Sequence, residues 1–536
     1  METMLMSALA VVAIGKAGHG QSSKISDWPQ TRAERTNYAE TSHYADVIDF
    51  IHGLQAAGAP VRLQYIGTTT EGFRMPLMVV SRTPVTSSTQ ARRLGKPVVY
   101  IQANIHAGEV EGKEAILHLV RKYCQDPTGV LDKIVLLVDP IYNIDGNEKF
   151  GPQNRNRPGQ GGPEMIGVRA NGQGLDLNRD YIKAETPEFN ASLTSIFTAW
   201  DPDVMMDLHT TDGTRHGYAL TYAPPLSPIT ASPVQEYVRD TMLPTIRKNL
   251  RSKFGLETFD YGNAERRGNT MAWYEVGPEG RYSTNYVGLR NRIGILSEAL
   301  TYPSFKDRVV STERFTDAVI QWVASKPKEI VQKSREADAN VIAWGLDPSK
   351  APPMGVRFEP LSRGVEGLLI EKKTAKHEGV PIDLETVKMD VYDRFKASKT
   401  EPFPAAYVIP SGQSKTADLL VKHGVRVEKF VTEWAGNCET FTVESFHQDG
   451  QPFQGHKLQS LEGTFRQQLV TAHQGDFLVR TSQPLGILIF HIMEPESLDG
   501  ALAWGFMGDK YAKGDTFPAY KAMKPVTAVT EKYQGD

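Results

Sequence analysis

The sequence predicts an α/β protein in which short buried strands alternate with helices. Three apolar segments, 98–101, 204–208 and 293–297, carry this prediction. Each is continuously apolar instead of alternating with polar residues, as is typical of strands that are buried on both faces of a sheet. Between them, 110–123 and 233–254 have helical patterns. The ligands of an open α/β sheet bind beyond the carboxyl ends of its strands, so we expect a functional site there.

The elements follow one another in a regular order up to about residue 325. An amphipathic helix is expected over 44–54, followed by strands over 61–66 and 75–80 on either side of a turn that contains Thr and Gly. Further strands are expected over 96–103, 133–138 and 204–208. Further helices are expected over 110–123, 187–199, 233–254 and 311–325. Residues 255–286 are rich in Gly, Arg and Tyr, which predicts a long loop suited to substrate selection.

The chain has 536 residues, which is too long for one ordinary domain. A Pro-containing break at 347–353 separates a first domain, 26–335, from a C-terminal α/β domain, 350–536. Within the second domain, strands are expected over 405–409, 425–430, 476–479 and 486–490, and a helix over 414–423. Its histidines lack metal-site spacing and are expected to be surface or hydrogen-bonded residues: His447, His456, His473 and His491.

The composition narrows the possible partners. The chain has 60 basic and 63 acidic residues and a net charge of −3, so it lacks the basic excess of a nucleic-acid-binding protein. Two cysteines, Cys124 and Cys438, form neither a disulfide framework nor a zinc-thiolate set and are expected to be free thiols. The sequence gives no indication of the oligomeric state.

The N-terminal segment, 1–25, contains an apolar run at 5–14 that is similar to the hydrophobic region of a secretory signal. The only charge before this run is that of Glu2, so the positively charged start of a signal is missing. We expect an exported protein, periplasmic or secreted. The alternative is a cytoplasmic protein in which this segment is a buried helix or a short anchor. No other segment is apolar enough for a membrane-spanning helix of about 20 residues, so no integral membrane domain is expected.

Candidate metal ligands follow the apolar segments. His106 and Glu109 form a His-x-x-Glu step after the first segment, and His209 follows the second. Two imidazoles and a carboxylate suit zinc and leave its fourth position open, which is the pattern of a catalytic site. Glu298 follows the third segment and is suited to take a proton from water. A lone histidine at a strand end is more often a surface or capping residue, so the prediction rests on the joint pattern.

A second polar cluster lies between the two histidines, at 169–180. The planar fork of Arg179 binds carboxylates bidentately, and Asn178 adds an amide donor, so the pair could hold the terminal carboxylate of a substrate. Asp176 could accept the other ring N–H of a ligand histidine and fix its tautomer. The alternative is a Gly- and Asn-containing loop with a surface arginine.

Taken together, these pieces resemble the M14 zinc carboxypeptidases, the carboxypeptidase A-like family. The matching pieces occur in the order of the family and comprise His106-x-x-Glu109, 143–146, 174–179, 207–209 and Glu298. The resemblance covers about residues 40 to 325. It implies a mixed, mostly parallel central sheet flanked by helices, one zinc ion, and hydrolysis of the C-terminal peptide bond of peptides that have a free terminal carboxylate.

The resemblance also implies roles for individual residues. His106, Glu109 and His209 match the zinc ligands, and Asp176 matches the partner of the first zinc histidine. Asn178 and Arg179 match the pair that grips the substrate carboxylate, and Glu298 matches the general base that activates water.

Two roles in the family have more than one candidate residue in this sequence. The arginine that stabilises the oxyanion is expected to be Arg169, with Arg155 and Arg157 as alternatives. The tyrosine that closes over the substrate is expected to be Tyr282 or Tyr286, and the more distant candidates are Tyr261 and Tyr274.

Three other functions remain open from the sequence. A related zinc amidohydrolase or deacylase would use the same metal set on small N-acyl amino acids, and an exported enzyme could trim cell-wall peptides. The third is an inactive binding module that keeps the fold. The presence of both histidines, Glu109 and Glu298 speaks against this third alternative.

Overall fold

The computed structural model describes residues 28–127, 129–372 and 379–535. The segment 1–25, for which the sequence predicts a signal, lies outside these residues. Within them, no helix combines the length and the apolar character that crossing a membrane requires.

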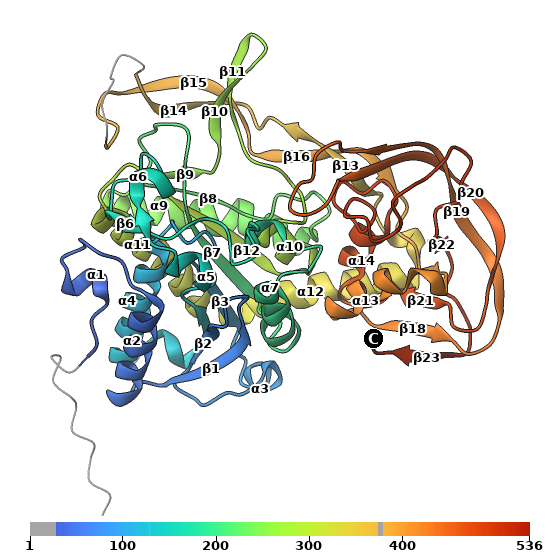
Figure 1. Ribbon diagram of the computed structural model, residues 1–536, viewed down its shortest axis with the longest axis horizontal. Coiled ribbons are helices and arrows are strands. Elements are labelled where there is room, and N and C mark those ends of the chain that lie inside the picture. The colour runs from blue at the N-terminus through green and yellow to red at the C-terminus, as the bar shows by residue number, and fades with distance from the viewer. Residues whose placement is uncertain (1–27, 128, 373–378, 536) are drawn as a thin grey trace, which may run out of the picture.

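A mixed sheet of eight strands, in the order β1-β2-β4-β3-β7-β12-β8-β9, forms the centre of the first part of the chain (Figure 1). The central strands β4, β3, β7 and β12 run parallel. Antiparallel pairs flank them, β1 with β2, β2 with β4, and β8 with β12. The predicted mixed, mostly parallel sheet is therefore confirmed. The strands are β1 (Val61–Thr68), β2 (Arg74–Val80), β3 (Val98–Ala103), β4 (Val135–Asp139), β7 (Val204–Thr210), β8 (Leu220–Ala223), β9 (Thr258–Asp260) and β12 (Ile293–Ala299).

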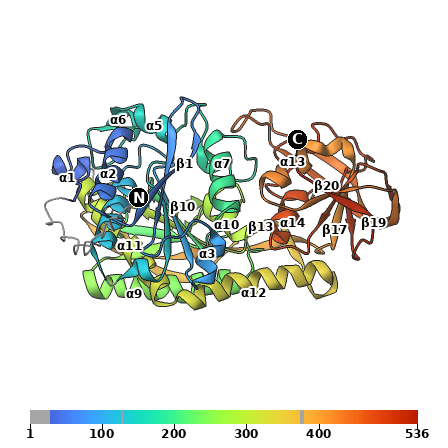
Figure 2. The ribbon, with the colours of Figure 1, turned by 90° about the horizontal axis from the view of Figure 1, so that it is seen from below.

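Helices flank this sheet, as Figures 1 and 2 show. Every residue of β3, β4 and β7 is buried, which explains why these segments are continuously apolar instead of alternating. The helix α4 packs on β3, β7 and α11. The larger helices of this part are α2 (Tyr44–Ala56), α4 (Glu111–Gln125), α7 (Pro187–Ser192), α9 (Leu243–Phe254), α10 (Ser283–Leu289), α11 (Phe305–Ser325) and α12 (Pro327–Leu346).

Two segments differ from the prediction. The predicted loop at 255–286 contains β9 and a hairpin of β10 (Asn263–Arg267) and β11 (Thr270–Tyr274). The strand β10 is largely exposed and rich in charge, so it lacks the apolar pattern by which strands are recognised. The predicted strand at 486–490 is a helix, α14 (Gly486–Met493), in which every residue is buried. A short apolar run does not distinguish a buried strand from a buried helix, which explains this error.

The expected boundary at residue 350 is crossed by secondary structure. The long helix α12 runs from the first part toward the C-terminal part (Figure 2). Beyond it, β15 (Leu384–Tyr392) pairs in parallel with β11, and this pairing joins residues on both sides of the boundary in one sheet. The other strands of this region are β13 (Met354–Leu361), β14 (Val365–Glu371) and β16 (Arg394–Glu401).

The rest of the chain forms what we call the C-terminal module, residues 405–535. Its seven-stranded sheet has the order β20-β19-β22-β17-β21-β18-β23. Its elements are β17 (Ala406–Ile409), α13 (Ser414–Lys422), β18 (Val427–Phe430), β19 (Trp434–Gln448), β20 (Gln459–Ala472), β21 (Phe477–Arg480), α14, β22 (Tyr520–Ala522) and β23 (Thr530–Tyr533). The two cysteines are buried free thiols, as predicted. Of the histidines expected to be surface or hydrogen-bonded residues, His491 is buried in α14, where its Nδ1 lies 3.5 Å from Ser497 Oγ and its Nε2 has no hydrogen-bond partner among the described residues.

Gly112 allows α4 to approach β7 closely, next to the turn that carries His106 and Glu109. A Cβ atom at this position would lie 2.7 Å from the Cβ of Leu208 and 3.4 Å from the Cβ of Ala103. Real Cβ contacts are not this short, so any side chain at residue 112 would push the helix away from the sheet.

We therefore expect Gly112→Ala to destabilise the fold by about 1–3 kcal/mol, as overpacking does. This sign is the reverse of the usual gain of about 0.4–1 kcal/mol when Gly is replaced by Ala at an unstrained position. Urea unfolding measures the difference. The control is Gly412→Ala, because a Cβ at this exposed turn meets nothing within 4 Å. A gain in stability for Gly112→Ala equal to that of the control would contradict the close packing.

Candidate active site

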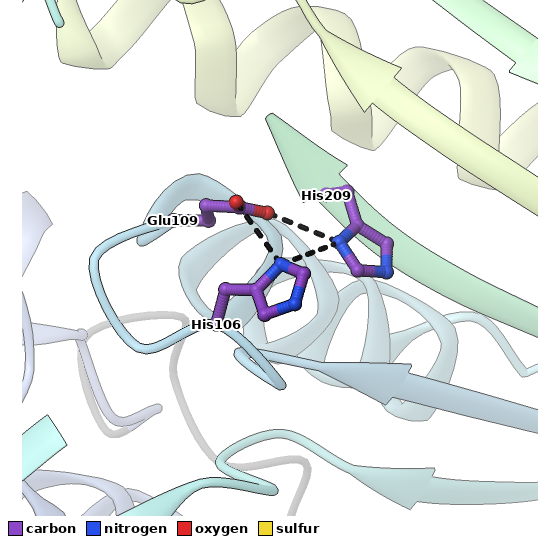
Figure 3. Close-up of side chains that lie close together, drawn as sticks. All are labelled: His106, Glu109 and His209. Atoms are coloured by element: carbon purple, nitrogen blue, oxygen red, sulfur yellow. Dashed lines mark hydrogen bonds and ion pairs between the residues drawn. The ribbon is translucent and has the colours of Figure 1, made fainter. Parts of the chain in front are cut away.

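Three side chains from two strand ends meet at the carboxyl edge of the sheet. His106 and Glu109 lie on the turn between β3 and α4, and His209 lies near the end of β7 (Figure 3). The two strands are parallel neighbours, so their ends lie side by side. The ligand atoms of these three buried residues lie within 4.8 Å of one another, and this is the only such group in the described parts of the chain.

The spacing of the facing atoms fits a metal ion. Glu109 Oε1 lies 3.1 Å from His106 Nδ1, Glu109 Oε2 lies 3.1 Å from His209 Nδ1, and the two Nδ1 atoms are 3.2 Å apart. Tetrahedral ligands at about 2.0–2.1 Å from zinc would be separated by roughly 3.3–3.4 Å. The separations are therefore close to those that a zinc ion requires, before any adjustment of the side chains.

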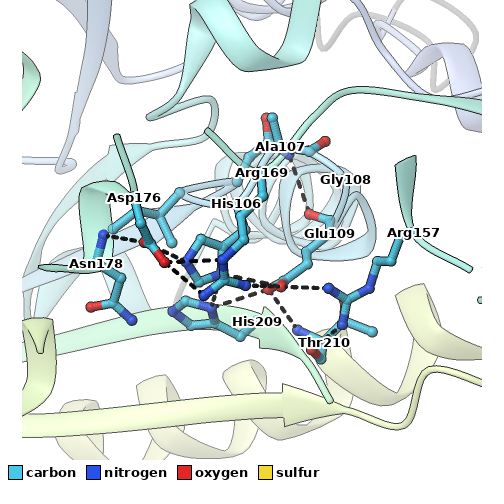
Figure 4. A network of polar contacts seen from close by, with 12 residues as sticks. His106, Ala107, Gly108, Glu109, Arg157, Arg169, Asp176, Asn178, His209 and Thr210 are labelled. Atoms are coloured by element: carbon cyan, nitrogen blue, oxygen red, sulfur yellow. Dashed lines mark hydrogen bonds and ion pairs between the residues drawn. The ribbon is translucent and has the colours of Figure 1, made fainter. Parts of the chain in front are cut away.

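The outer nitrogens of the two histidines face carboxylates. His106 Nε2 lies 3.0 Å from Asp176 Oδ1, and His209 Nε2 lies 2.9 Å from Asp207 Oδ2. Since a carboxylate only accepts hydrogen bonds, the proton of each ring is assigned to Nε2, and the Nδ1 lone pairs point at each other. Such an arrangement of facing acceptors fits a cation between them. Figure 4 shows Asp176 behind His106.

Asp207 is a site residue whose role sequence reasoning did not identify. It precedes His209 by two residues on the same strand, so both side chains point to the same face, and this spacing was the available signal. Its carboxylate also accepts hydrogen bonds from Gln102 Nε2 at 3.2 Å and from Ser283 Oγ at 2.5 Å. These contacts fix the carboxylate that faces His209.

Glu109 is held from the side opposite the histidines. Arg157 donates to Glu109 Oε1 at 2.8 Å and also to the carbonyl oxygens of Thr210 and Thr211, and the Thr210 N–H donates to Glu109 Oε2 at 3.0 Å. Burial alone would raise the pKa of Glu109, but Arg157 and His106 outweigh this effect and hold it well below its ordinary value. The carboxylate is therefore kept ionised.

These ligands line a cavity of about 300 Å³. The residues predicted to bind substrate also line it, namely Asn178, Arg179 and Tyr282, together with Arg169 and Glu298. Tyr261, the more distant tyrosine candidate, also lines the cavity. The other wall residues are Thr210, Asp212, Ala223, Leu226, Asn263, Glu275, Val276, Gly277, Ser283, Thr284, Asn285 and Leu296.

Arg169 and Arg179 gather around Asp176. Arg169 Nε donates to Asp176 Oδ2 at 3.0 Å, and Arg179 lies 3.8 Å from the same oxygen. Asn143 ties this loop to the histidine turn, because its amide donates to the carbonyls of Ile105 and Arg169. Both guanidinium groups therefore lie at the edge of the metal-ligand group (Figure 4 shows Arg169).

The arginine candidates have different surroundings. Arg169 lines the cavity with a half-exposed side chain, whereas Arg157 is occupied by Glu109 and by backbone carbonyls and is not part of the cavity wall. The only hydrogen bond among the described residues that involves the side chain of Arg155 is to Asn156, at the surface. Of the three, Arg169 alone is placed to touch a molecule in the cavity.

The tyrosine candidates also separate. Tyr282 lines the cavity, and its ring lies under the guanidinium of Arg179 at 4.7 Å. Tyr286 is a correction to the prediction, because its ring is fully buried and its hydroxyl is bound to His423 and Arg290, away from the cavity. The difference arises because Tyr282 is the N-cap residue with extended backbone that precedes α10, whereas Tyr286 lies inside the helix and faces the core.

Glu298 lies beside His209 because the parallel pairing of β12 with β7 places these two residues in register. Adjacent residues in register point to the same face of a sheet, so both side chains reach the cavity. Glu298 Oε2 is buried and has no hydrogen-bond partner among the described residues. Burial raises the pKa of Glu298 to about 8, an effect that His209 partly offsets.

Glu275 is a second buried acid in the cavity wall. It follows β11 and is 5% exposed, and its carboxylate accepts a hydrogen bond from the Val276 N–H at 2.9 Å. Across the described residues, no ion pair links it to a Lys, Arg or His side chain. Burial, together with Asp393 and Glu298 nearby, raises its pKa well above the ordinary value.

Comparisons with known proteins relate the chain to carboxypeptidases. The family model for zinc carboxypeptidases matches residues 47–201, a range that includes His106, Glu109, Asn178 and Arg179. Carboxypeptidase 2 of Trichophyton equinum is 22% identical over 470 residues, which cover 84% of this chain and 81% of the relative. The catalytic chain of human carboxypeptidase N is 27% identical over 151 residues, which cover 27% of this chain and 31% of the relative.

Among solved structures, carboxypeptidase A from Helicoverpa armigera matches with 16% identity and a TM-score of 0.38, over 56% of this chain and 75% of that structure. A metallo-carboxypeptidase from Pseudomonas aeruginosa matches with 16% identity and a TM-score of 0.37, over 54% of this chain and 68% of that structure. Residues 47–201 of this chain therefore match the zinc carboxypeptidase model, and the curated relatives that align over most of the chain are carboxypeptidases.

Proposed function

We propose that this metallocarboxypeptidase uses zinc to hydrolyse the last peptide bond of peptides that have a free C-terminal carboxylate. One observation carries the proposal. A single cavity brings together a metal-ligand group, a carboxylate suited to act as a base, and an Asn–Arg pair suited to bind a carboxylate. A C-terminal peptide bond needs all three within reach of each other.

Zinc would be held by His106 Nδ1, His209 Nδ1 and the carboxylate of Glu109. When bound, zinc lowers the pKa of water and polarises a carbonyl group. Asp176 and Asp207 face the outer ring nitrogens and would accept their protons, which keeps both Nδ1 atoms available as ligands. The family match supports this choice of metal.

Arg179 and Asn178 would bind the terminal carboxylate of the peptide. Arg179 leans on Tyr282, which limits its freedom and aims its fork into the cavity. Arg169 would donate to the carbonyl oxygen of the scissile bond as negative charge develops there, and one such donor is worth about 3–4 kcal/mol.

Glu298 would take a proton from the attacking water and deliver it to the leaving amine. A base works best when its pKa lies near the working pH, and burial moves the pKa of Glu298 in this direction. Its unpaired Oε2 leaves an oxygen free for this proton transfer.

Glu275 would select the side chain of the last residue. Arg169 and Arg179 lie around Asp176, whereas Glu275 and Asp212 share a neighbourhood with Glu298 and Tyr261. A C-terminal residue with a cationic side chain would match both groups, its carboxylate the two arginines and its side chain the two acids. We therefore propose a preference for basic C-terminal residues.

The first test is the trimming of a mixed peptide library, in which every peptide is present with a free and with an amidated C-terminus. We expect stepwise loss of single residues from the free ends, abolished by a chelator and restored by zinc, as detected by mass spectrometry. Glu298→Gln should keep its zinc, as measured by metal analysis, but lose most turnover, because Gln cannot accept the proton. Cleavage within peptides, or of amidated ends, would exclude the proposed carboxylate recognition.

Removing the carboxylate behind His209 should weaken zinc binding. We expect Asp207→Asn to lower zinc affinity about 10- to 100-fold, which is the usual effect of losing such a partner. Competition with a chromogenic chelator measures it. Asp139→Asn is the control, because Asp139 is a buried aspartate at the end of the neighbouring β4 that contacts neither histidine. Equal zinc affinities for the two variants would remove Asp207 from this role.

Glu275→Gln should reduce the preference for Lys or Arg over Leu at the C-terminus about tenfold or more, because a charge partner is lost in a buried site. The raised pKa of Glu275 means that this preference should grow as the pH rises and the carboxyl ionises. Relative kcat/KM values for matched peptides at several pH values measure both effects. Glu265→Gln, on the exposed hairpin, is the control. An unchanged preference in Glu275→Gln would show that other residues select the side chain.

A further inference from the structure

The cavity loop 277–283 is held by the C-terminal module, although the module lines none of the cavity described above. The loop joins β11 to α10 and supplies Gly277, Tyr282 and Ser283 to the cavity wall. Its Gly280 packs against His491 of α14, where a Cβ would lie 2.7 Å from His491 Nε2. Figure 1 shows α10 at the side of the first part that faces α14.

Asp499 makes the strongest contact to this loop. Its Oδ2 accepts the backbone N–H of Arg281 at 2.6 Å, and its Oδ1 lies 2.8 Å from a guanidinium nitrogen of the same residue. Trp504 Nε1 donates to Asp499 Oδ1 at 2.9 Å. The guanidinium of Arg281 also lies over the rings of Trp504, at 4.9 Å, and Phe453, at 5.3 Å. Asp499 is fully buried, so this ion pair is sealed from solvent.

The two residues that follow Arg281 in the loop contact the site directly. The Ser283 N–H donates to Asn178 Oδ1 at 3.0 Å, and Ser283 Oγ donates to Asp207 Oδ2, the atom that faces His209. Tyr282, the residue between Arg281 and Ser283, supports Arg179. A shift of this loop would therefore move the residues proposed to bind the substrate carboxylate.

A second contact reaches the other histidine. Gln454, in the connection between β19 and β20, accepts the backbone N–H of Asp176 through Oε1 at 2.8 Å. Asp176 in turn faces His106. In the same connection, His456 Nε2 lies 2.8 Å from Glu185, and this contact fastens the connection to the first part of the chain.

We propose that the C-terminal module is a positioning element of the active site, in which Asp499 holds the loop 277–283 and Gln454 holds Asp176. This inference rests on the proposed function for its effect on catalysis. Positioning active-site residues is a different task from packing against the first part or controlling the access of substrate. Neither residue touches the substrate, so both act through the residues that they hold.

Substitutions that remove each of the two contacts should have different effects. Asp499→Asn keeps the size of the side chain but loses its charge and one acceptor for Arg281. We expect it to raise KM for peptides with a free C-terminus about tenfold with a smaller change in kcat, because the loop borders Asn178 and Arg179. Hydrogen exchange of residues 277–286 should rise. Gln454→Leu removes the acceptor for Asp176 and should weaken zinc binding about tenfold, near the lower end of the effect of losing a ligand's partner.

Matched controls come from the same connection between β19 and β20. Asp449→Asn and Gln451→Leu change exposed residues that lie outside these contacts, and both variants should behave like the unmodified protein. All measurements use the full chain, with the thermal midpoint and zinc content recorded for each variant. Should Asp499→Asn fail to fold, Trp504→Phe tests the same contact, since it removes the hydrogen bond to Asp499 Oδ1 and keeps a smaller aromatic ring beside Arg281.

The outcomes separate the possibilities. Raised KM and local exchange at an unchanged thermal midpoint support the positioning role. Unchanged KM, exchange and zinc affinity overturn it, as does a uniform loss of kcat and thermal midpoint without a change in KM. If the unmodified protein cleaves no peptide, the proposed function fails, whereas exchange of 277–286 and zinc affinity still decide whether the module holds the site.

Discussion

The register between β7 and its two parallel neighbours is the constraint on which the site depends. The pairing of β7 with β12 places His209 beside Glu298, and the pairing with β3 places Gln102 beside Asp207. A slip of one residue would turn every side chain of a strand to the opposite face. Because all three strands are buried on both faces, such a slip would bury charge in the core, and the core therefore enforces the register.

Charge balance explains how so many ionisable groups share a buried site. Three carboxylates, those of Glu109, Asp176 and Asp207, surround two imidazoles. Arginines contact Glu109 and Asp176, whereas Asp207 accepts hydrogen bonds from Gln102 and Ser283. Isolated burial of any of these charges would be costly, whereas paired and hydrogen-bonded charges are tolerated. Among the described residues, neither Glu298 nor Glu275 forms an ion pair with an arginine, and the pKa of each carboxyl is raised by burial. We assign the proton transfer to Glu298 and the binding of a cationic substrate side chain to Glu275.

The C-terminal module contacts the part of the chain that carries the proposed active site. Its contacts reach Arg281 and Asp176. Each of these two residues lies next to residues of the site, on opposite sides of the metal-ligand group. The sheet that joins β11 to β15 adds a third link between the two parts of the chain. The first part therefore contacts the rest of the chain at two of its loops and through one sheet.

The sequence alone predicted the central sheet, most helices and part of the set of side chains that line the cavity, namely His106, Glu109, Arg169, Asn178, Arg179, His209, Tyr282 and Glu298. Apolar strands followed by His106 and His209 were enough, because parallel strand ends meet at one edge of a sheet. It failed at α14, where an apolar run fits a strand or a helix equally well, and at Tyr286, where spacing does not reveal which side of a helix faces the core. Only the tertiary structure could decide these, together with the selection of Arg169 over Arg157, the burial of Glu275 and the reach of Asp499 to Arg281. Each depends on contacts between residues far apart in the chain, and local periodicity carries no information about such contacts.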